Sequence, residues 1–307
     1  LCGCARISSR HRSEVPLLGQ DLFSALRRRV AILGPGLIGG SLAMALGRRG
    51  SDWQVSLWAR RAEAVEETSL VLPNCVVSTS LAEAVKDCEI AVLCTSPHAI
   101  ASAGPELKKL LPPCAVVTDA GSVKEKIVTA LEAELGGRFV GAHPMAGSEQ
   151  NGIQAAREDL FDGAVCVLTP TASTDPAALE WVKNLWIAAG CVLREMPPAV
   201  HDRAIARISH LPHAVAASLV HAAVGANPSF AELGGGGYRD TTRIAGGPES
   251  MWAEIFLDNR SELLNGIADL QTALDTLKVA LESGNRNALE AFLSDARRLR
   301  SQKPSTE

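Results

Sequence analysis

Aromatic residues are scarce in this chain of 307 residues, at 4%, and so is any excess of positive charge, since the net charge is −4. A core with few large rings depends on close approach of backbones. The acidic balance argues against a nucleic-acid partner. No C-x-x-C pair occurs among the eight cysteines, so we expect no metal site and reduced, buried thiols, as in a cytoplasmic protein.

A secretory signal is also lacking, because residues 1–29 contain no apolar core. We predict that residues 1–28 are a disordered N-terminal extension. Residues 208–231 contain no Asp, Glu, Lys or Arg, and a stretch of this length could span a membrane. Its histidines, its serines and Pro212, set among many alanines, favour a buried helix instead, so we expect no membrane association.

Short apolar strands alternate with helical patterns in the first half of the chain, which predicts a doubly wound parallel sheet covered on both faces. Long helices dominate after residue 195. We therefore predict an α/β domain at 29–193 and an all-helical domain at 194–307. Strands are expected at 29–33, 54–58, 76–78, 89–94, 115–118, 139–141 and 165–169, and the long helices of the second domain at 199–225, 251–283 and 286–301.

A glycine motif follows the first predicted strand directly. Gly34, Gly36 and Gly39 form G-x-G-x-x-G between a strand and a helix. In a Rossmann-type domain the three glycines allow the tight turn, the approach of the pyrophosphate and the packing of helix on strand. The start of the helix, at Leu37 and Ile38, offers N–H groups to the phosphates. A glycine-rich turn without a ligand is the alternative, and the strand–helix context weighs against it.

The end of the second predicted strand bears on the choice of cofactor. NAD enzymes place an acidic residue there, whereas this chain has Ala59 followed by Arg60 and Arg61. Two arginines could bind a 2′-phosphate, so we favour NADP over NAD, the alternative being solvated residues at a helix start. Residues 95–97, Thr95-Ser96-Pro97, follow another apolar strand and are expected to contact the ribose on the nicotinamide side.

Polar residues that follow later predicted strands indicate a catalytic site. Ser122 and His143 each follow a predicted strand, where ligands of open α/β sheets bind. A neutral imidazole can accept a proton from an alcohol, and Ser122 could hydrogen-bond to it. Arg243 suits a substrate carboxylate. Taken alone, His143 could be an ordinary turn residue and Arg243 an ordinary surface residue. These two alternatives are less plausible because both residues occur together in a chain with a dinucleotide-binding fold.

Several motifs together resemble the prephenate/arogenate dehydrogenase family over about residues 29–300. The resemblance implies an oxidoreductase that catalyses NAD(P)-dependent oxidative decarboxylation of prephenate to 4-hydroxyphenylpyruvate in tyrosine biosynthesis. The alternative is an arogenate or dual cyclohexadienyl dehydrogenase that forms tyrosine. The family resemblance also implies a homodimer whose interface is formed by the helical domain. The motifs are Gly-Pro-Gly-Leu-Ile-Gly-Gly-Ser at 34–41, Asp-Ala-Gly-Ser-Val-Lys at 119–124, His-Pro-Met-Ala-Gly-Ser-Glu at 143–149, Ser-His-Leu-Pro-His at 209–213 and Asp-Thr-Thr-Arg-Ile-Ala at 240–245.

The resemblance also implies roles for single residues. His143 polarises the ring hydroxyl as the catalytic base, with Ser122 beside it, and Arg243 holds the ring carboxylate. Asp119 is assigned to the cofactor site. Trp252 contributes to the substrate pocket from across the dimer. The remaining implied residues are His213, Ser148 and Gly236 at the side-chain end of the pocket, and an ionic cluster of Glu149, Arg239 and Asp240 at its mouth.

Other functions are less consistent with the sequence. A 3-hydroxyacid dehydrogenase needs a catalytic lysine in the second domain, and residues 202–220 contain none. A non-catalytic NADP sensor would not need His143 and Arg243. Prephenate is favoured over arogenate by His213 and the Gln150-Asn151 pair, although Glu149 could meet the ammonium group of arogenate. The chain ends soon after its last helix, so we expect tyrosine inhibition either to act at the substrate site or not to occur.

Overall fold

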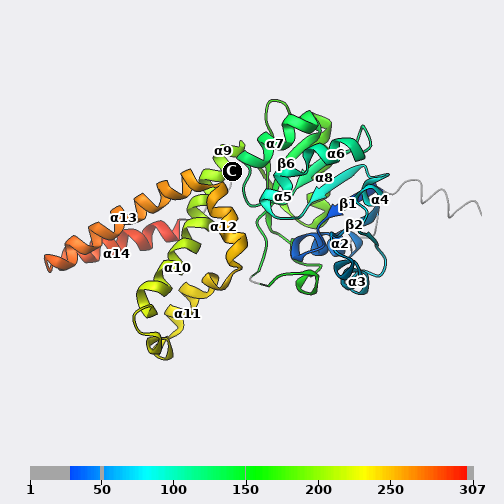
Figure 1. Ribbon diagram of the computed structural model, residues 1–307. Helices are drawn as coiled ribbons and strands as arrows, with labels where there is room; N and C mark the ends of the chain where they lie inside the picture. The colour runs from blue at the N-terminus through cyan, green and yellow to red at the C-terminus, as the bar shows by residue number, and fades with distance from the viewer. Residues whose placement is uncertain (1–27, 49–51, 149, 303–307) are drawn as a thin grey trace, which may run out of the picture.

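The computed structural model describes residues 28–48, 52–148 and 150–302. Figure 1 shows an α/β domain and a helical domain that projects from it. The expected N-terminal extension lies outside the described residues, except for Arg28, which is already the first residue of strand β1. Within the described ranges no helix, including the one in the charge-free stretch, is both long and apolar enough to cross a membrane.

An eight-stranded sheet with the order β3-β2-β1-β4-β5-β6-β7-β8 forms the centre of the α/β domain. The order reverses between β1 and β4, which is where open α/β sheets bind their ligands. All the predicted strands are present. The strands are β1 (Arg28–Leu33), β2 (Trp53–Trp58), β3 (Val76–Ser78), β4 (Ile90–Leu93), β5 (Val116–Asp119), β6 (Phe139–Pro144), β7 (Val165–Thr169) and β8 (Val192–Glu195).

The sheet is parallel as predicted except at one pair of strands near its edge. Strand β7 runs antiparallel to β6, with Val167 opposite His143, and β8 pairs parallel to β7. Sequence patterns did not predict β8, because this short strand has mostly exposed residues and no apolar run. It also crosses the predicted domain boundary at residue 193, since the strand continues to Glu195 and the first helix of the helical domain begins at Pro198.

The two faces of the sheet bury separate cores, because successive side chains of a strand point to opposite sides. In β1, Val30 and Ile32 belong to one core, whereas Ala31 and Leu33 belong to the other. The doubly wound prediction is confirmed by this arrangement. The first core is covered by α2 (Leu37–Arg48) and α8 (Pro176–Ala189), the second by α4 (Leu81–Val85), α5 (Pro97–Ser102), α6 (Gly104–Leu110) and α7 (Glu125–Leu135), while α3 (Ala62–Val71) follows β2.

The helical domain contains more breaks than the sequence predicted. The expected helix at 199–225 is interrupted by a π-helical turn, Ala206–His210, just before Pro212, which has no N–H group to donate. The expected helix at 251–283 is divided at Asn259. The predicted helix at 286–301 is confirmed. The α-helices are α9 (Pro198–Ile205), α10 (Leu211–Val224), α11 (Gly236–Thr242), α12 (Glu249–Asp258), α13 (Arg260–Glu282) and α14 (Arg286–Ser301).

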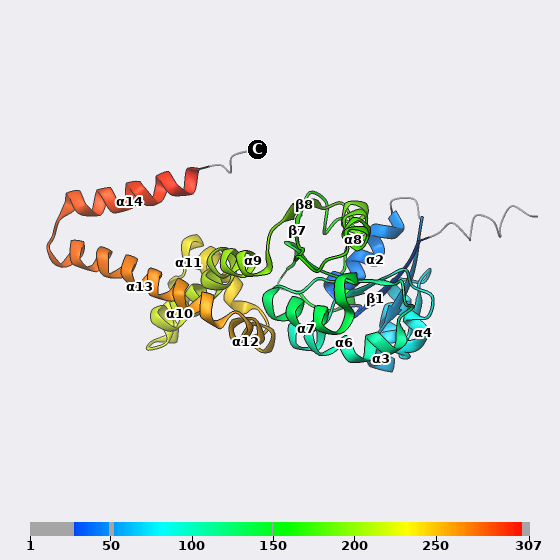
Figure 2. The same ribbon diagram turned by 90° about the horizontal axis from the view of Figure 1, so that it is seen from above.

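The two domains meet along α9 and α12. Ile255 of α12 is part of the second core of the α/β domain, and Lys126 forms an ion pair with Asp258. Asp202 of α9 accepts backbone hydrogen bonds from Lys124 and Glu125 at the start of α7. Figure 2 shows that α13 and α14 point away from this contact as an antiparallel pair. The seam between the domains is formed by α9, α12 and the start of α7. Its contacts hold the helical domain in a defined position against the sheet.

Candidate active site

The glycine loop after β1 has the geometry that a pyrophosphate requires. Gly34 has φ +110°, and a Cβ there would lie 2.7 Å from the carbonyl oxygen of Cys94. A Cβ on Gly39 would lie 2.2 Å from the carbonyl oxygen of Gly34, whereas one on Gly36 would meet nothing within 4 Å. Helix α2 begins at Leu37 and has no acidic residue in its first turn. The loop thus leaves an open, electropositive helix end, which fits a dinucleotide phosphate.

Beside this loop lies the end of β2. The N–H group of Gly34 donates to the carbonyl oxygen of Trp58 at 3.0 Å. Ala59 is buried, while Arg60 and Arg61 are exposed just before α3. Neither arginine forms an ion pair with another residue in the described part of the chain, and neither lines the cavity described next.

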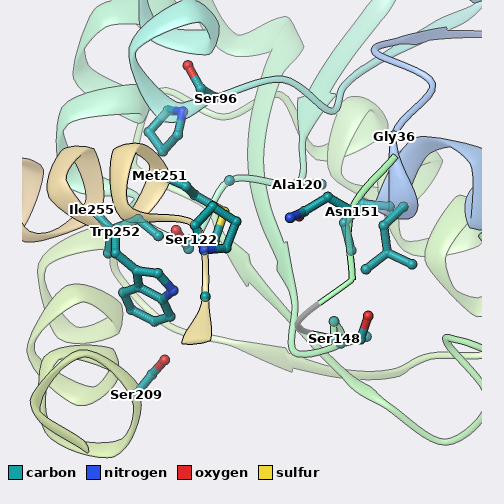
Figure 3. Close-up of a pocket in the computed structure, with 18 of the residues that line it drawn as sticks. Gly36, Ser96, Ala120, Ser122, Ser148, Asn151, Ser209, Met251, Trp252 and Ile255 are labelled. Atoms are coloured by element: carbon teal, nitrogen blue, oxygen red, sulfur yellow. The ribbon is translucent and has the colours of Figure 1, made fainter. Parts of the chain in front are cut away.

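A cavity of about 740 Å³ lies between the two domains and contains most of the predicted site residues. Figure 3 shows Gly36 and Ala120 of the α/β domain facing Met251 and Trp252 of α12 across it, with Ser122 between them. The structure thereby brings the glycine loop, the strand ends and the helical domain to one place. The predicted residues that line the cavity are Gly36, Leu37, Ile38, Thr95, Ser96, Pro97, Ser122, His143, Ser148, His213, Arg243 and Trp252.

His143 lies on β6 in the wall of this cavity. Its side chain is 9% exposed, and its Nδ1 lies 2.8 Å from Nε2 of His201. Burial, followed by the charges of His201 and Lys124, lowers the pKa of His143 well below its ordinary value. The imidazole is therefore neutral near pH 7, and with Nδ1 engaged by His201 its Nε2 is left for a ligand.

Asp119 has a different position from the one we predicted. It is fully buried, does not line the cavity, and forms an ion pair with Lys124. Its carboxylate also accepts the backbone N–H groups of Gly121 at 2.9 Å and Ala142 at 3.0 Å. These bonds join the ends of β5 and β6, so Asp119 holds the segments of Ser122 and His143 side by side instead of facing the cofactor cavity.

The helical domain supplies an aromatic wall. The rings of His213 and Trp252 stack with centroids 3.5 Å apart and planes 15° apart. Both belong to the same chain and line the same cavity, so Trp252 reaches the pocket of its own chain. Its contribution to the pocket of a partner subunit stays a prediction. Burial lowers the pKa of His213, which keeps the ring neutral. Arg243 lines the cavity from the turn after α11.

Three predicted residues of the pocket lie away from it. Gly236 is the first residue of α11 and does not line the cavity, and Arg239 and Asp240 are exposed on the same helix. Ser148 does line the cavity, and its hydroxyl accepts the N–H group of Gln150 at 3.1 Å. Glu149 lies outside the described residues.

Several residues that complete the site had no role assigned to them from the sequence. Ser209 and His210 reach the cavity from the π-helical turn, which is a common location for functional groups. His201 and Asp202 lie behind His143. The sequence signal for Ser209 and His210 is the motif Ser-His-Leu-Pro-His at 209–213, in which we had assigned a role only to His213. Further lining residues to which we had assigned no role are Met145, Gly247, Met251 and Ile255, while Asn151, which we used to favour prephenate, also lines the cavity.

A doubly wound sheet with this glycine loop, and a buried histidine at a strand end beside it, defines an oxidoreductase that uses NAD(P). Two family models match the chain, the nucleotide-binding domain of prephenate dehydrogenase at residues 42–195 and the dimerization domain of prephenate dehydrogenase at residues 197–295. The chain therefore belongs to the prephenate dehydrogenase family.

Individual relatives agree with this membership. Prephenate dehydrogenase of Bacillus subtilis is 31% identical over 290 residues, which are 90% of this chain and 76% of the relative. The structure of prephenate dehydrogenase from A. aeolicus with hydroxyphenyl propionate and NAD+ is 32% identical with a TM-score of 0.81, covering 89% of this chain and 97% of that one. Arogenate dehydrogenase of Synechocystis is 32% identical with a TM-score of 0.76, covering 89% and 98%.

Proposed function

We propose that this enzyme catalyses the NAD(P)-dependent oxidative decarboxylation of prephenate to 4-hydroxyphenylpyruvate. One observation carries the proposal: a single cavity joins the glycine loop at Gly36 to His143 and Ser122, and continues to Arg243 and Trp252. Such a cavity accommodates a dinucleotide and a small cyclic acid together. The relative from A. aeolicus was solved with hydroxyphenyl propionate, an aromatic acid, and with NAD+.

Each side chain then has a defined task. His143 accepts the proton of the ring hydroxyl at Nε2, and Ser122 orients that hydroxyl. Arg243 holds the ring carboxylate through a forked contact, while Trp252 and His213 enclose the side chain of the substrate. The nicotinamide ring, when bound, accepts the hydride. The resulting ring ketone loses carbon dioxide because this loss makes the ring aromatic, so no separate group is needed for decarboxylation.

Prephenate is favoured over arogenate by the charges around the cavity. Arogenate differs in its side-chain ammonium group, which needs an acidic partner. Among the described lining residues there is no aspartate or glutamate, and the neutral groups of His213 and Asn151 are present instead. Arogenate dehydrogenase of Synechocystis is similar to this chain, and arogenate is accordingly the second candidate.

NADP is favoured over NAD by the end of β2. Ala59 offers no carboxylate to ribose hydroxyls, and the exposed guanidinium groups of Arg60 and Arg61 are suited to a 2′-phosphate. We also assign the helical domain to the interface of a homodimer, because α13 and α14 carry apolar residues that no described residue of the same chain covers. Leu264, Leu274, Leu281, Leu293 and Leu299 are each more than half exposed.

A steady-state matrix of two substrates against two cofactors tests the proposal. We expect the highest kcat/KM for prephenate with NADP, measured as the appearance of reduced cofactor. His143→Asn is the matched inactive variant, and its kcat should be lower by about 10²–10⁴ with cofactor affinity unchanged. A higher kcat/KM for arogenate would overturn the substrate assignment, and a higher value for NAD would overturn the cofactor assignment.

A further inference from the structure

A second histidine lies directly behind His143, on helix α9 of the helical domain. His143 Nδ1 and His201 Nε2 are 2.8 Å apart, and His201 Nδ1 lies 2.7 Å from Oδ1 of Asp202. His201 is fully buried and Asp202 is 3% exposed. A continuous chain of hydrogen bonds therefore runs from a buried carboxylate to the cavity wall. The role proposed for His143 as the base assigns no task to these two partners.

Asp202 is held as an acceptor. Its Oδ1 accepts the backbone N–H group of Lys124 at 2.7 Å, and its Oδ2 accepts that of Glu125 at 2.9 Å. Burial alone raises the pKa of Asp202, but the hydrogen bonds from His201 and from these two N–H groups outweigh burial and lower it below its ordinary value. The carboxylate is consequently ionised, and an ionised carboxylate can only accept hydrogen bonds.

The ionised carboxylate of Asp202 determines the direction of the other hydrogen bonds in this series. Because Asp202 only accepts, His201 donates from Nδ1. Burial lowers the pKa of His201, so the ring is neutral and has a lone pair on Nε2. That lone pair accepts from His143, which must then donate from Nδ1. His143 is thereby left with its own lone pair on Nε2, the nitrogen that is available to the cavity.

We infer that His201 and Asp202 are positioning residues that fix the tautomer of His143, so that an unprotonated Nε2 meets the substrate hydroxyl. The inference rests on the proposed role of His143 as the base. In the reaction the O–H bond of the substrate breaks and a bond between that proton and Nε2 forms. The Nδ1–H group keeps its hydrogen bond to His201, whose neutral ring, backed by the Asp202 carboxylate, stabilises the new imidazolium.

The tautomers can be measured without any turnover. Long-range 1H–15N correlation spectra of the full chain with 15N-labelled histidine distinguish the Nδ1–H from the Nε2–H form, and the His143→Asn variant assigns the signals of His143. We expect Nδ1–H for both His143 and His201. An Nε2–H form of His143 would overturn the inference. Failure to oxidise prephenate or arogenate would refute the proposed function and would leave this result unaffected.

Variants of His201 test the consequence for turnover. His201→Leu removes the acceptor of His143, whereas His201→Gln offers an amide oxygen in its place. We expect kcat of His201→Leu to fall about 10–100-fold with both KM values within about twofold, a mixture of His143 tautomers, and partial recovery in His201→Gln. Arg203→Gln, on the exposed side of the same helix, is the control and should behave as wild type.

Two outcomes of this series would contradict the positioning role. Wild-type kcat with an unchanged His143 tautomer in His201→Leu would show that the histidine pair is not needed. An equal loss in Arg203→Gln would assign the effect to the helix as a whole. If His201→Leu does not fold, the tautomer of His143 in the wild-type protein decides the question.

Discussion

The surroundings of His143 disfavour a charged imidazole, and this has a measurable consequence for pH dependence. Burial, followed by the charges of His201 and Lys124, lowers the pKa of His143 from its ordinary value of 6.5. The free enzyme therefore keeps its base unprotonated below that pH. We expect kcat/KM to stay level from about pH 8 to about pH 6.5 and to decline only at lower pH.

The check is a pH profile of kcat/KM with enzyme that is incubated at each pH and assayed again at pH 7.5. The second assay separates protonation from irreversible loss. A decline that begins above pH 7 would contradict the lowered pKa. The pH profile of His201→Gln can be compared with that of the wild-type enzyme, because this variant retains an acceptor for His143 but lacks the imidazole ring of His201.

Arg243 is the residue whose substitution should change substrate binding most. Its proposed partner, the ring carboxylate, is present in the ground state and leaves only after hydride transfer, so the contact contributes similarly to ground and transition states. We expect Arg243→Gln to raise KM for prephenate about 10–100-fold and to lower kcat by less than about tenfold. Arg243→Lys should restore little, because lysine lacks the planar fork.

Steady-state kinetics with both variants test this assignment, and cofactor KM is the internal control. A large fall in kcat at constant KM would mean that Arg243 acts on the transition state instead of anchoring the carboxylate.

At the scale of elements, the turn between β2 and α3 is the segment that we propose selects the cofactor. If Arg60 and Arg61 bind a 2′-phosphate, the double variant Arg60→Ala, Arg61→Ala should weaken NADP about tenfold or more and leave NAD nearly unchanged. Ala59→Asp should shift preference toward NAD by supplying an acceptor for ribose hydroxyls. Fluorescence titration with both reduced cofactors measures these affinities. Equal losses for NADP and NAD in the double variant would exclude phosphate recognition.

Much of the element order could be predicted because it depends on local signals. Apolar runs predicted the strands that are covered on both faces, and helix α14 begins at residue 286 as predicted. The side chain of Asn285, just before it, accepts the N–H group of Ala288. The glycine loop was predictable from its place between strand and helix. Strand β8 lacked such a signal, since it is short, lies at the sheet edge and is largely exposed.

The site was less predictable where it depends on contacts between domains. Ser122 and His143 follow strands, and the topology of a parallel sheet brings strand ends together. His201 is 58 residues away from His143 in sequence and lies in an ordinary helix. Only the docking of α9 against α7 places it behind the base. Asp119 was assigned to the cofactor by its motif, whereas its carboxylate binds backbone groups and Lys124 inside the sheet.

At the scale of the whole molecule, the uncovered apolar surface of the helical domain predicts a homodimer. Besides the exposed leucines of α13 and α14, helix α10 buries only His213 and Ala216 within one chain. A surface of this kind is usually covered by a partner. We expect sedimentation at micromolar concentration to give twice the chain mass. Replacing Leu274 and Leu281 by Glu should yield monomers, and a monomeric wild-type protein would refute the assignment.

The seam between the domains makes the molecule sensitive to acid. Burial lowers the pKa of His143, His201, His210 and His213, that of His210 to about 4. In the unfolded chain these groups titrate near 6.5, so between about pH 6.5 and pH 4 the unfolded state binds more protons. The free energy of unfolding therefore keeps its full value above pH 6.5 and decreases as the pH falls. For each histidine the decrease is at most about 1.4 kcal/mol per pH unit. Urea midpoints at pH 7.5 and pH 5 measure this fall, and equal midpoints would contradict it.

Of these four histidines, His143 and His201 face each other across the contact between the domains, whereas His210 and His213 contact Asn259 and Trp252 within the helical domain. A proton taken up by His143 or His201 therefore places a charge between the two domains. Mild acidification should therefore undock the helical domain while the sheet stays folded. His143, the proposed base, loses its contact with His201 at that moment, so we expect activity to be lost at a pH at which the sheet is still folded.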